Sequence, residues 1–141
     1  MIFLILIDYG TIMLKKLFCL FFTIVGIGCA QSAEKSGEIT VHELKRWLDE
    51  KKNFVLIDVR TPGEHSEGYI PGTGWNIDYR ELERRIGETA VPRDKTIVVY
   101  CRSGRRSSIA KKTLTSMGFK NVINLKGSMI AWGKARYPVA N

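Results

Sequence analysis

One short segment of this chain combines a strand, a turn and the start of a helix: Ile97-Val98-Val99-Tyr100-Cys101-Arg102-Ser103-Gly104-Arg105-Arg106-Ser107. The apolar run over 97–100 is mostly β-branched and shows no polar alternation, which predicts a buried strand of a parallel sheet. From Ser107 onward apolar residues recur at helical spacing, so we expect a helix to begin there. The segment therefore predicts an α/β fold in which Cys101 ends a strand and precedes a helix.

This position favours a reactive cysteine. Open α/β sheets bind ligands at the carboxyl ends of their strands, and the N–H groups of a helix N-terminus attract anions. Arg102, Arg105 and Arg106 add positive charge beside the thiol. We therefore expect Cys101 to ionise more readily than a free thiol, whose pKa is about 8.5, and to act as a nucleophile in an anion-binding loop.

Length and composition indicate a single globular domain. The chain has 141 residues, of which 45% are hydrophobic and 26% charged, and this balance excludes a mainly disordered protein. The formal net charge of +8 is compatible with binding to a nucleic acid, a membrane surface or a small anion, and also with lysines that are only solvated. Basic and aromatic residues do not interleave, so we expect no nucleic-acid partner.

The first thirty residues have the pattern of an export signal. Lys15 and Lys16 precede an apolar run over 17–27, which is the length of a signal-peptide core and shorter than the roughly 20 residues of a membrane span. We expect translation to start at Met13, because residues 1–12 fit poorly as the start of a signal. The predicted organisation is a leader (1–30), a linker (31–37) and a domain (38–138), with export to the periplasm.

Two routes of leader processing stay open. Gly28-Cys29-Ala30 satisfies the small-x-small rule for cleavage, and Gly28-Cys29 also resembles a lipoprotein box, in which Cys29 is lipidated and anchors the protein to a membrane. Both routes leave Cys101 as the single cysteine of the domain. A lone cysteine in an exported domain is either an inert buried thiol or a free reactive one. The neighbouring arginines favour the reactive thiol.

A second buried strand is predicted over 54–59, with Asp58 inside it. A carboxylate in an apolar strand must be hydrogen-bonded or paired. We expect Asp58, together with Arg60, to support the active loop structurally. Arg60 and Glu64 are close enough in sequence to pair across the turn that follows. Further signals predict a capping box at Thr40 and helices over 79–88 and 129–135.

Three motifs of the chain resemble those of the rhodanese family, in its single-domain, exported bacterial form. Ile57-Asp58-Val59-Arg60, Glu64-His65 and Gly68-Tyr69-Ile70-Pro71-Gly72 resemble its first signature, residues 100–107 its active-site loop, and residues 118–127 with Met129, Ala131 and Trp132 its last signature. The resemblance covers residues 38–138. It implies a three-layer α/β fold, with a five-stranded parallel sheet and helices on both faces, and a cysteine that carries a persulfide.

The resemblance also implies an activity, that of a thiosulfate sulfurtransferase. Cys101 would take sulfur from thiosulfate and pass it to cyanide, a thiol or a thioredoxin-like partner. Substrate binding would fall on the other residues of the loop, Arg102, Ser103, Gly104, Arg105 and Arg106. Among these we rank Arg105 first and Arg102 second for contact with the anion. The mechanism needs no cofactor, and no His/Cys cluster in the sequence offers a metal site. We expect a monomer whose only membrane contact is through the leader or a lipid at Cys29.

Two other functions stay open. Cysteine phosphatases and arsenate reductases use a loop of Cys, five residues and Arg, but the position counted from Cys101 holds Ser107, so this reaction is disfavoured. A persulfide carrier that serves a protein partner shares the first half-reaction of a transferase, and the sequence does not separate the two.

The chain departs from the family pattern at two places. The segment Thr73-Gly74-Trp75-Asn76 is about one residue longer than usual, and Gly127-Ser128 stands where the family commonly has two glycines. We expect neither departure to touch Cys101.

Overall fold

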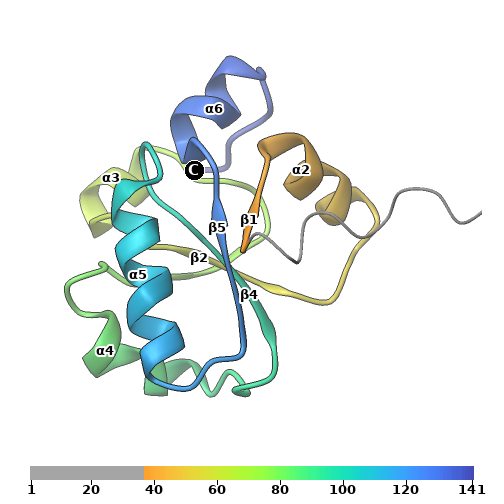
Figure 1. Cartoon of the computed structure of the whole chain (residues 1–141). Coiled ribbons are helices and arrows are strands. Elements are labelled where there is room, and N and C mark those ends of the chain that lie inside the picture. Colours follow the sequence, from red (N-terminus) through yellow and green to blue (C-terminus); the bar gives the residue numbers. More distant parts are fainter. Residues whose placement is uncertain (1–36) are drawn as a thin grey trace, which may run out of the picture. The chain divides into compact units, whose positions relative to one another are not determined.

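The computed structural model describes residues 37–141, which contain a five-stranded parallel sheet (Figure 1). The spatial order of the strands is β1-β5-β4-β2-β3, and every neighbouring pair is parallel, as the resemblance implied. The central position of β4 places its carboxyl end, and therefore Cys101, in the middle of one edge of the sheet. The strands are β1 (Glu38–Ile39), β2 (Val55–Asp58), β3 (Thr73–Asn76), β4 (Thr96–Tyr100) and β5 (Asn121–Leu125).

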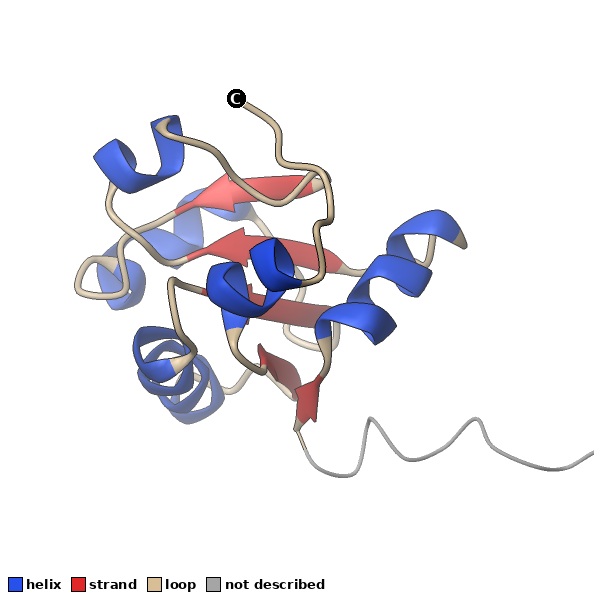
Figure 2. Ribbon diagram, turned by 90° about the horizontal axis from the view of Figure 1, so that it is seen from above, coloured by secondary structure: helices blue, strands red, loops and turns tan. Residues whose placement is uncertain are grey.

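Helices cover both faces of the sheet (Figure 2). Successive residues of β4 point to opposite faces, as in any strand: Val98 packs in the cluster that holds Leu44 and Trp132, and Val99 in the cluster that holds Leu82 and Leu114. The predicted three-layer arrangement is therefore confirmed. The helices are α2 (Val41–Asp49), α3 (Pro62–Ser66), α4 (Leu82–Arg85), the 3₁₀ helix η1 (Ile86–Thr89), α5 (Arg105–Ser116) and α6 (Ser128–Lys134).

Helix α5 begins at Arg105, two residues before the predicted start at Ser107. Gly104 occupies the N-cap with φ 107°, a left-handed conformation that glycine adopts without a Cβ clash. The turn after Cys101 is therefore complete within three residues. As a result, the N–H groups at the start of α5 lie close to the cysteine.

The extra residue predicted near Gly74 is absorbed by a β-bulge. Leu56 pairs with Thr73 and Ile57 pairs with Trp75, so Gly74 has no partner on β2. Because β3 is an edge strand, the bulge disturbs pairing on one side only. The longer segment thus forms a strand, and its irregularity stays in the sheet edge.

The last residues of the chain pair with the loop that precedes β3. Tyr69 and Ala140 exchange two backbone hydrogen bonds, of 2.8 and 2.9 Å. The indole N–H of Trp132 donates to the carbonyl of Pro138 at 2.8 Å. These contacts hold the segment after α6 against the core and against the loop that contains Tyr69.

Several sequence predictions lie outside the described residues. The leader (1–30), the start at Met13, the lipidation of Cys29 and nearly all of the linker (31–37) belong to this group. Export and anchoring therefore stay predictions. Over residues 37–141, no helix has the length and apolar character that crossing a membrane requires.

Candidate active site

Cys101 lies at the base of the loop that joins β4 to α5. Its side chain is a free thiol and is 1% exposed. The backbone N–H of Gly104 donates to Sγ at 3.1 Å, and the Ser107 hydroxyl lies 3.5 Å from Sγ. Donors from the N-cap and the first turn of α5 are thus directed at the sulfur.

These donors favour the thiolate. Burial raises the pKa of the Cys101 thiol, but hydrogen bonds from the Ser107 hydroxyl and from the N–H groups of Ser107, Gly104 and Ser103 outweigh burial, so the pKa lies below its ordinary value. The Ser107 hydroxyl also lies 3.0 Å from the carbonyl oxygen of Gly104. Its single proton serves one acceptor at a time, and a negative charge on Sγ draws it to the sulfur.

Arg106 is held by Glu64, which lies in the first turn of α3. Its Nη2 is 2.6 Å from Glu64 Oε1 and its Nη1 is 2.7 Å from Oε2. The predicted pair between Arg60 and Glu64 is wrong, because Glu64 sits in a capping box with Thr61 and faces α5. The Arg106 guanidinium lowers the pKa of Glu64 to about 2.

Asp58 and Arg60 form a buried pair at the end of β2. The backbone N–H and Nε of Arg60 donate to Asp58 Oδ1 at 3.0 Å, and its Nη2 donates to Oδ2 at 2.6 Å. Arg60 Nη2 also donates to the carbonyl of Gly68 at 2.7 Å, and His65 Nδ1 lies 3.0 Å from Asp58 Oδ2. The pair therefore ties β2 to α3 and to the loop after it.

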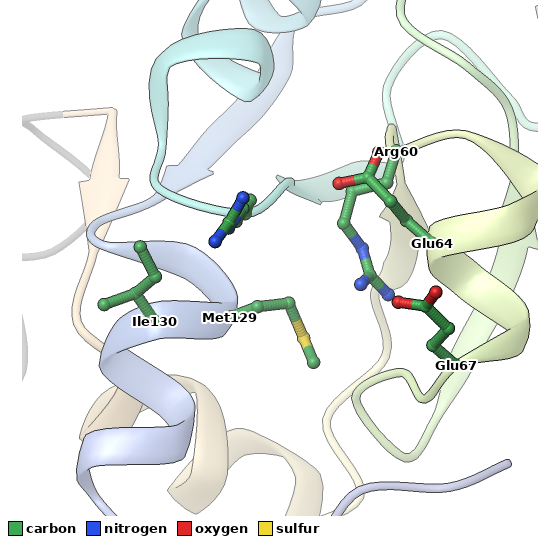
Figure 3. A pocket seen from close by; sticks show the side chains of 6 residues that line it. Arg60, Glu64, Glu67, Met129 and Ile130 are labelled. Atoms are coloured by element: carbon green, nitrogen blue, oxygen red, sulfur yellow. The ribbon is translucent and has the colours of Figure 1, made fainter.

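The other two loop arginines line different hollows. Arg102 lines a cavity of about 390 Å³, into which Glu64 and Glu67 reach from α3 and its C-cap, and Met129 from α6 (Figure 3). Arg105 lines a second hollow of about 460 Å³. Among residues 37–141 neither Arg102 nor Arg105 forms an ion pair, so both guanidinium groups are free to bind an anion. The same part of the chain holds no cluster of three metal-ligating side chains.

Ser128 contacts the cysteine directly, contrary to the expectation from sequence. Its hydroxyl accepts the backbone N–H of Cys101 at 3.1 Å and donates to the carbonyl of Leu125 at 3.0 Å. The N–H of Met129 donates to the carbonyl of Cys101 at 3.1 Å. The departure from a glycine pair therefore places a hydroxyl against the backbone of Cys101.

The fold and this loop agree with a comparison of the sequence against known families. Residues 40–135 match the family described as the rhodanese-like domain. The chain belongs to the rhodanese family. Among its rhodanese relatives, a sulfurtransferase of Allochromatium vinosum is 35% identical over 102 residues, which cover 72% of this chain and 92% of that protein.

Further rhodanese relatives differ in length. The thiosulfate sulfurtransferase PspE of Escherichia coli is 42% identical over 72 residues, 50% of this chain and 67% of PspE. The probable adenylyltransferase/sulfurtransferase MoeZ of Mycobacterium tuberculosis is 36% identical over 109 residues, 77% of this chain but only 28% of MoeZ. The human single-domain sulfurtransferase TSTD1 superposes with a TM-score of 0.62 at 25% identity, over 70% of this chain and 96% of TSTD1.

Proposed function

We propose that this rhodanese is a thiosulfate sulfurtransferase that moves a sulfur atom through a persulfide on Cys101. The observation that carries the proposal is the sulfur of Cys101 at the base of a loop whose N–H groups and Ser107 hydroxyl point at it. Relatives named as sulfurtransferases support sulfur transfer as the class of reaction, and PspE supports thiosulfate as the donor.

The first half-reaction consumes thiosulfate. The Cys101 thiolate attacks the outer sulfur, a new S–S bond forms to Sγ, and the S–S bond of thiosulfate breaks with its electron pair leaving on sulfite. The product on the protein is the anion Cys–S–S⁻, so charge and atoms balance. Loop N–H donors that stabilise the thiolate are also placed to stabilise the persulfide anion.

The second half-reaction releases the sulfur. Cyanide attacks the outer persulfide sulfur through its carbon, thiocyanate leaves, and the Cys101 thiolate is restored. A thiolate acceptor does the same and leaves as its own persulfide. Because the first product leaves before the acceptor reacts, the kinetics are ping-pong.

The unpaired loop arginines supply the charge that binds the donor. Thiosulfate and sulfite are dianions, and neither Arg102 nor Arg105 forms an ion pair among residues 37–141. Arg106 is committed to Glu64 and acts as a fixed positive charge beside the loop. We assign substrate contact to Arg105 first and to Arg102 second.

The test combines mass and turnover. Intact-mass analysis after thiosulfate treatment should show a gain of one sulfur atom, and this gain should be absent in Cys101→Ser. When the protein is made with its leader, the same mass spectrum also gives the cleavage site and shows any lipid on Cys29. Steady thiocyanate formation from thiosulfate and cyanide identifies a transferase. A single sulfur uptake without turnover identifies a persulfide carrier, and no uptake overturns the proposal.

A further inference from the structure

We propose that Ser128 is a positioning residue for Cys101: its hydroxyl fixes the backbone of the cysteine and so keeps Sγ beneath the donors of the loop. The inference rests on the proposed function only in taking Cys101 as the reacting group. Ser128 does not touch the sulfur itself. Its effect passes through the peptide of Cys101.

The Ser128 hydroxyl bridges the chain after β4 to the end of β5, just beyond the last backbone pairing of the two strands. The last paired residues of β4 and β5 are Val99 and Asn124. Beyond them, the N–H of Cys101 and the carbonyl of Leu125 are joined through the hydroxyl, at 3.1 and 3.0 Å. A hydroxyl has one proton, so it accepts from Cys101 and donates to Leu125, and both directions are fixed.

Burial makes this bridge hard to replace. Ser128 is 0% exposed and Cys101 is 1% exposed. Among the described residues, the hydroxyl is the acceptor for the N–H of Cys101, and a buried N–H without a partner is rare in folded proteins. The neighbouring Met129 N–H holds the carbonyl of Cys101. Two consecutive residues therefore fix the N–H and the C=O of the cysteine, and with them the direction of its Cα–Cβ bond.

The backbone conformation of Ser128 would suit glycine better than serine, which indicates that serine is present for its hydroxyl. Its φ is 46°, in the left-handed region that glycine occupies at little cost. A side chain kept in such a conformation persists where the surroundings over-determine it, commonly at functional sites. In this protein, the hydrogen bonds of the Ser128 hydroxyl to Cys101 and Leu125 hold the serine in this conformation.

The decisive variant is Ser128→Gly, which removes the hydroxyl and suits the backbone. Its matched control is Ser116→Ala, which removes a hydroxyl bonded to the Thr113 carbonyl on the exposed end of α5. The readout is the rate of Cys101 alkylation by iodoacetamide against pH, followed on the Cys101 peptide by mass spectrometry without any sulfur donor. We expect the profile of Ser128→Gly to move to higher pH, with kcat for thiocyanate formation down about tenfold and KM for thiosulfate unchanged. Ser116→Ala should match the wild type.

A second variant keeps the test decisive if the first fails to fold. Ser128→Ala also lacks the hydroxyl, and urea unfolding identifies which variants are folded. The inference is overturned if a folded variant of either kind retains the wild-type alkylation profile. Because alkylation needs no thiosulfate, a wild type that fails to use thiosulfate contradicts the proposed function and leaves this test intact.

Discussion

Glu64 and Arg106 join the first turn of α3 to the first turn of α5 through two hydrogen bonds, of 2.6 and 2.7 Å. They lie 42 residues apart in the chain. The pair keeps one positive charge beside the cysteine loop, while Arg102 and Arg105 form no ion pair among residues 37–141. It also connects α3, which buries none of its own residues, to the body of the domain.

The ion pair makes stability depend on pH. Glu64 has a folded-state pKa of about 2, below the value of about 4.3 for an unfolded chain. Its contribution is therefore complete above the unfolded pKa and is lost as the pH falls through the folded one. We expect Glu64→Gln to lower the free energy of unfolding by about 1 kcal/mol at pH 7, and the difference to shrink below pH 4. Urea unfolding at pH 7 and pH 3 measures it.

The control for this variant is Glu81→Gln, which removes the partner of Arg84 on the surface. Both side chains of that pair are well exposed, so little change is expected. A loss of stability in Glu64→Gln that is equally large at both pH values would contradict the assignment.

Substrate contact by Arg105 is tested by kinetics. Arg105→Ala removes an unpaired guanidinium from the loop, and a charge-assisted hydrogen bond is stabilising by about 1.5 kcal/mol or more, so KM for thiosulfate should rise about tenfold. Arg84→Ala, on the far helix α4, is the control. A normal KM in Arg105→Ala together with a raised KM in Arg102→Ala would move the contact to Arg102.

Two Asp-x-Arg pairs share three hydrogen bonds within the pair but differ in the burial of the arginine. Among residues 37–141, only the side chains of Arg60 and Asp58 have further hydrogen-bond partners, Gly68 and His65. In both, the backbone N–H and Nε of the arginine donate to Oδ1 at 3.0 Å, and Nη2 donates to Oδ2 at 2.6 Å. The Arg60 side chain is 8% exposed and that of Arg80 is 65% exposed. Asp58→Asn leaves a buried charge unpaired and should cost about 3–5 kcal/mol. Asp78→Asn should cost a small fraction of that, and equal losses in urea unfolding would refute the role of burial.

The Ser107 hydroxyl is the strongest of the donors that lower the pKa of Cys101. Ser107→Ala should therefore shift the alkylation of Cys101 to higher pH. Ser108→Ala is the neighbouring control, since no hydrogen bond joins Ser108 to the sulfur among those of the described residues. Superimposable profiles for the two variants would exclude the hydroxyl as a source of the shift.

Local sequence predicted the strand, turn and helix around Cys101 because each depends on neighbours in the chain. The β-branched run before the cysteine and the glycine at the cap act within a few residues. The apolar pattern indicates a start of α5 at Ser107, two residues after the true start, because Arg105 and Arg106 lack apolar side chains. Their place in the first turn follows from the backbone of Gly104.

Side-chain partners across the site were not predictable in the same way. Glu64 meets Arg106, and Ser128 meets Cys101 over a separation of 27 residues, only because parallel strands bring their carboxyl ends to one edge. Arg60 lies close to Glu64 in the chain and was therefore the expected partner, but the fold brings Arg106 to Glu64 instead. The resemblance to a family supplied the topology but not the contact made by Ser128, where this chain departs from the usual glycine.

The pairing of Tyr69 with Ala140 links the segment after α6 to the loop that supports Arg60. The carbonyl of Gly68, next to Tyr69, accepts a hydrogen bond from the guanidinium of Arg60, which also donates to Asp58. Removing residues 138–141 would thus loosen the contacts that support Arg60 and Asp58 while leaving every residue of the cysteine loop in place. For protein engineering, a purification tag or fusion partner after Asn141 needs a flexible spacer that leaves this pairing undisturbed.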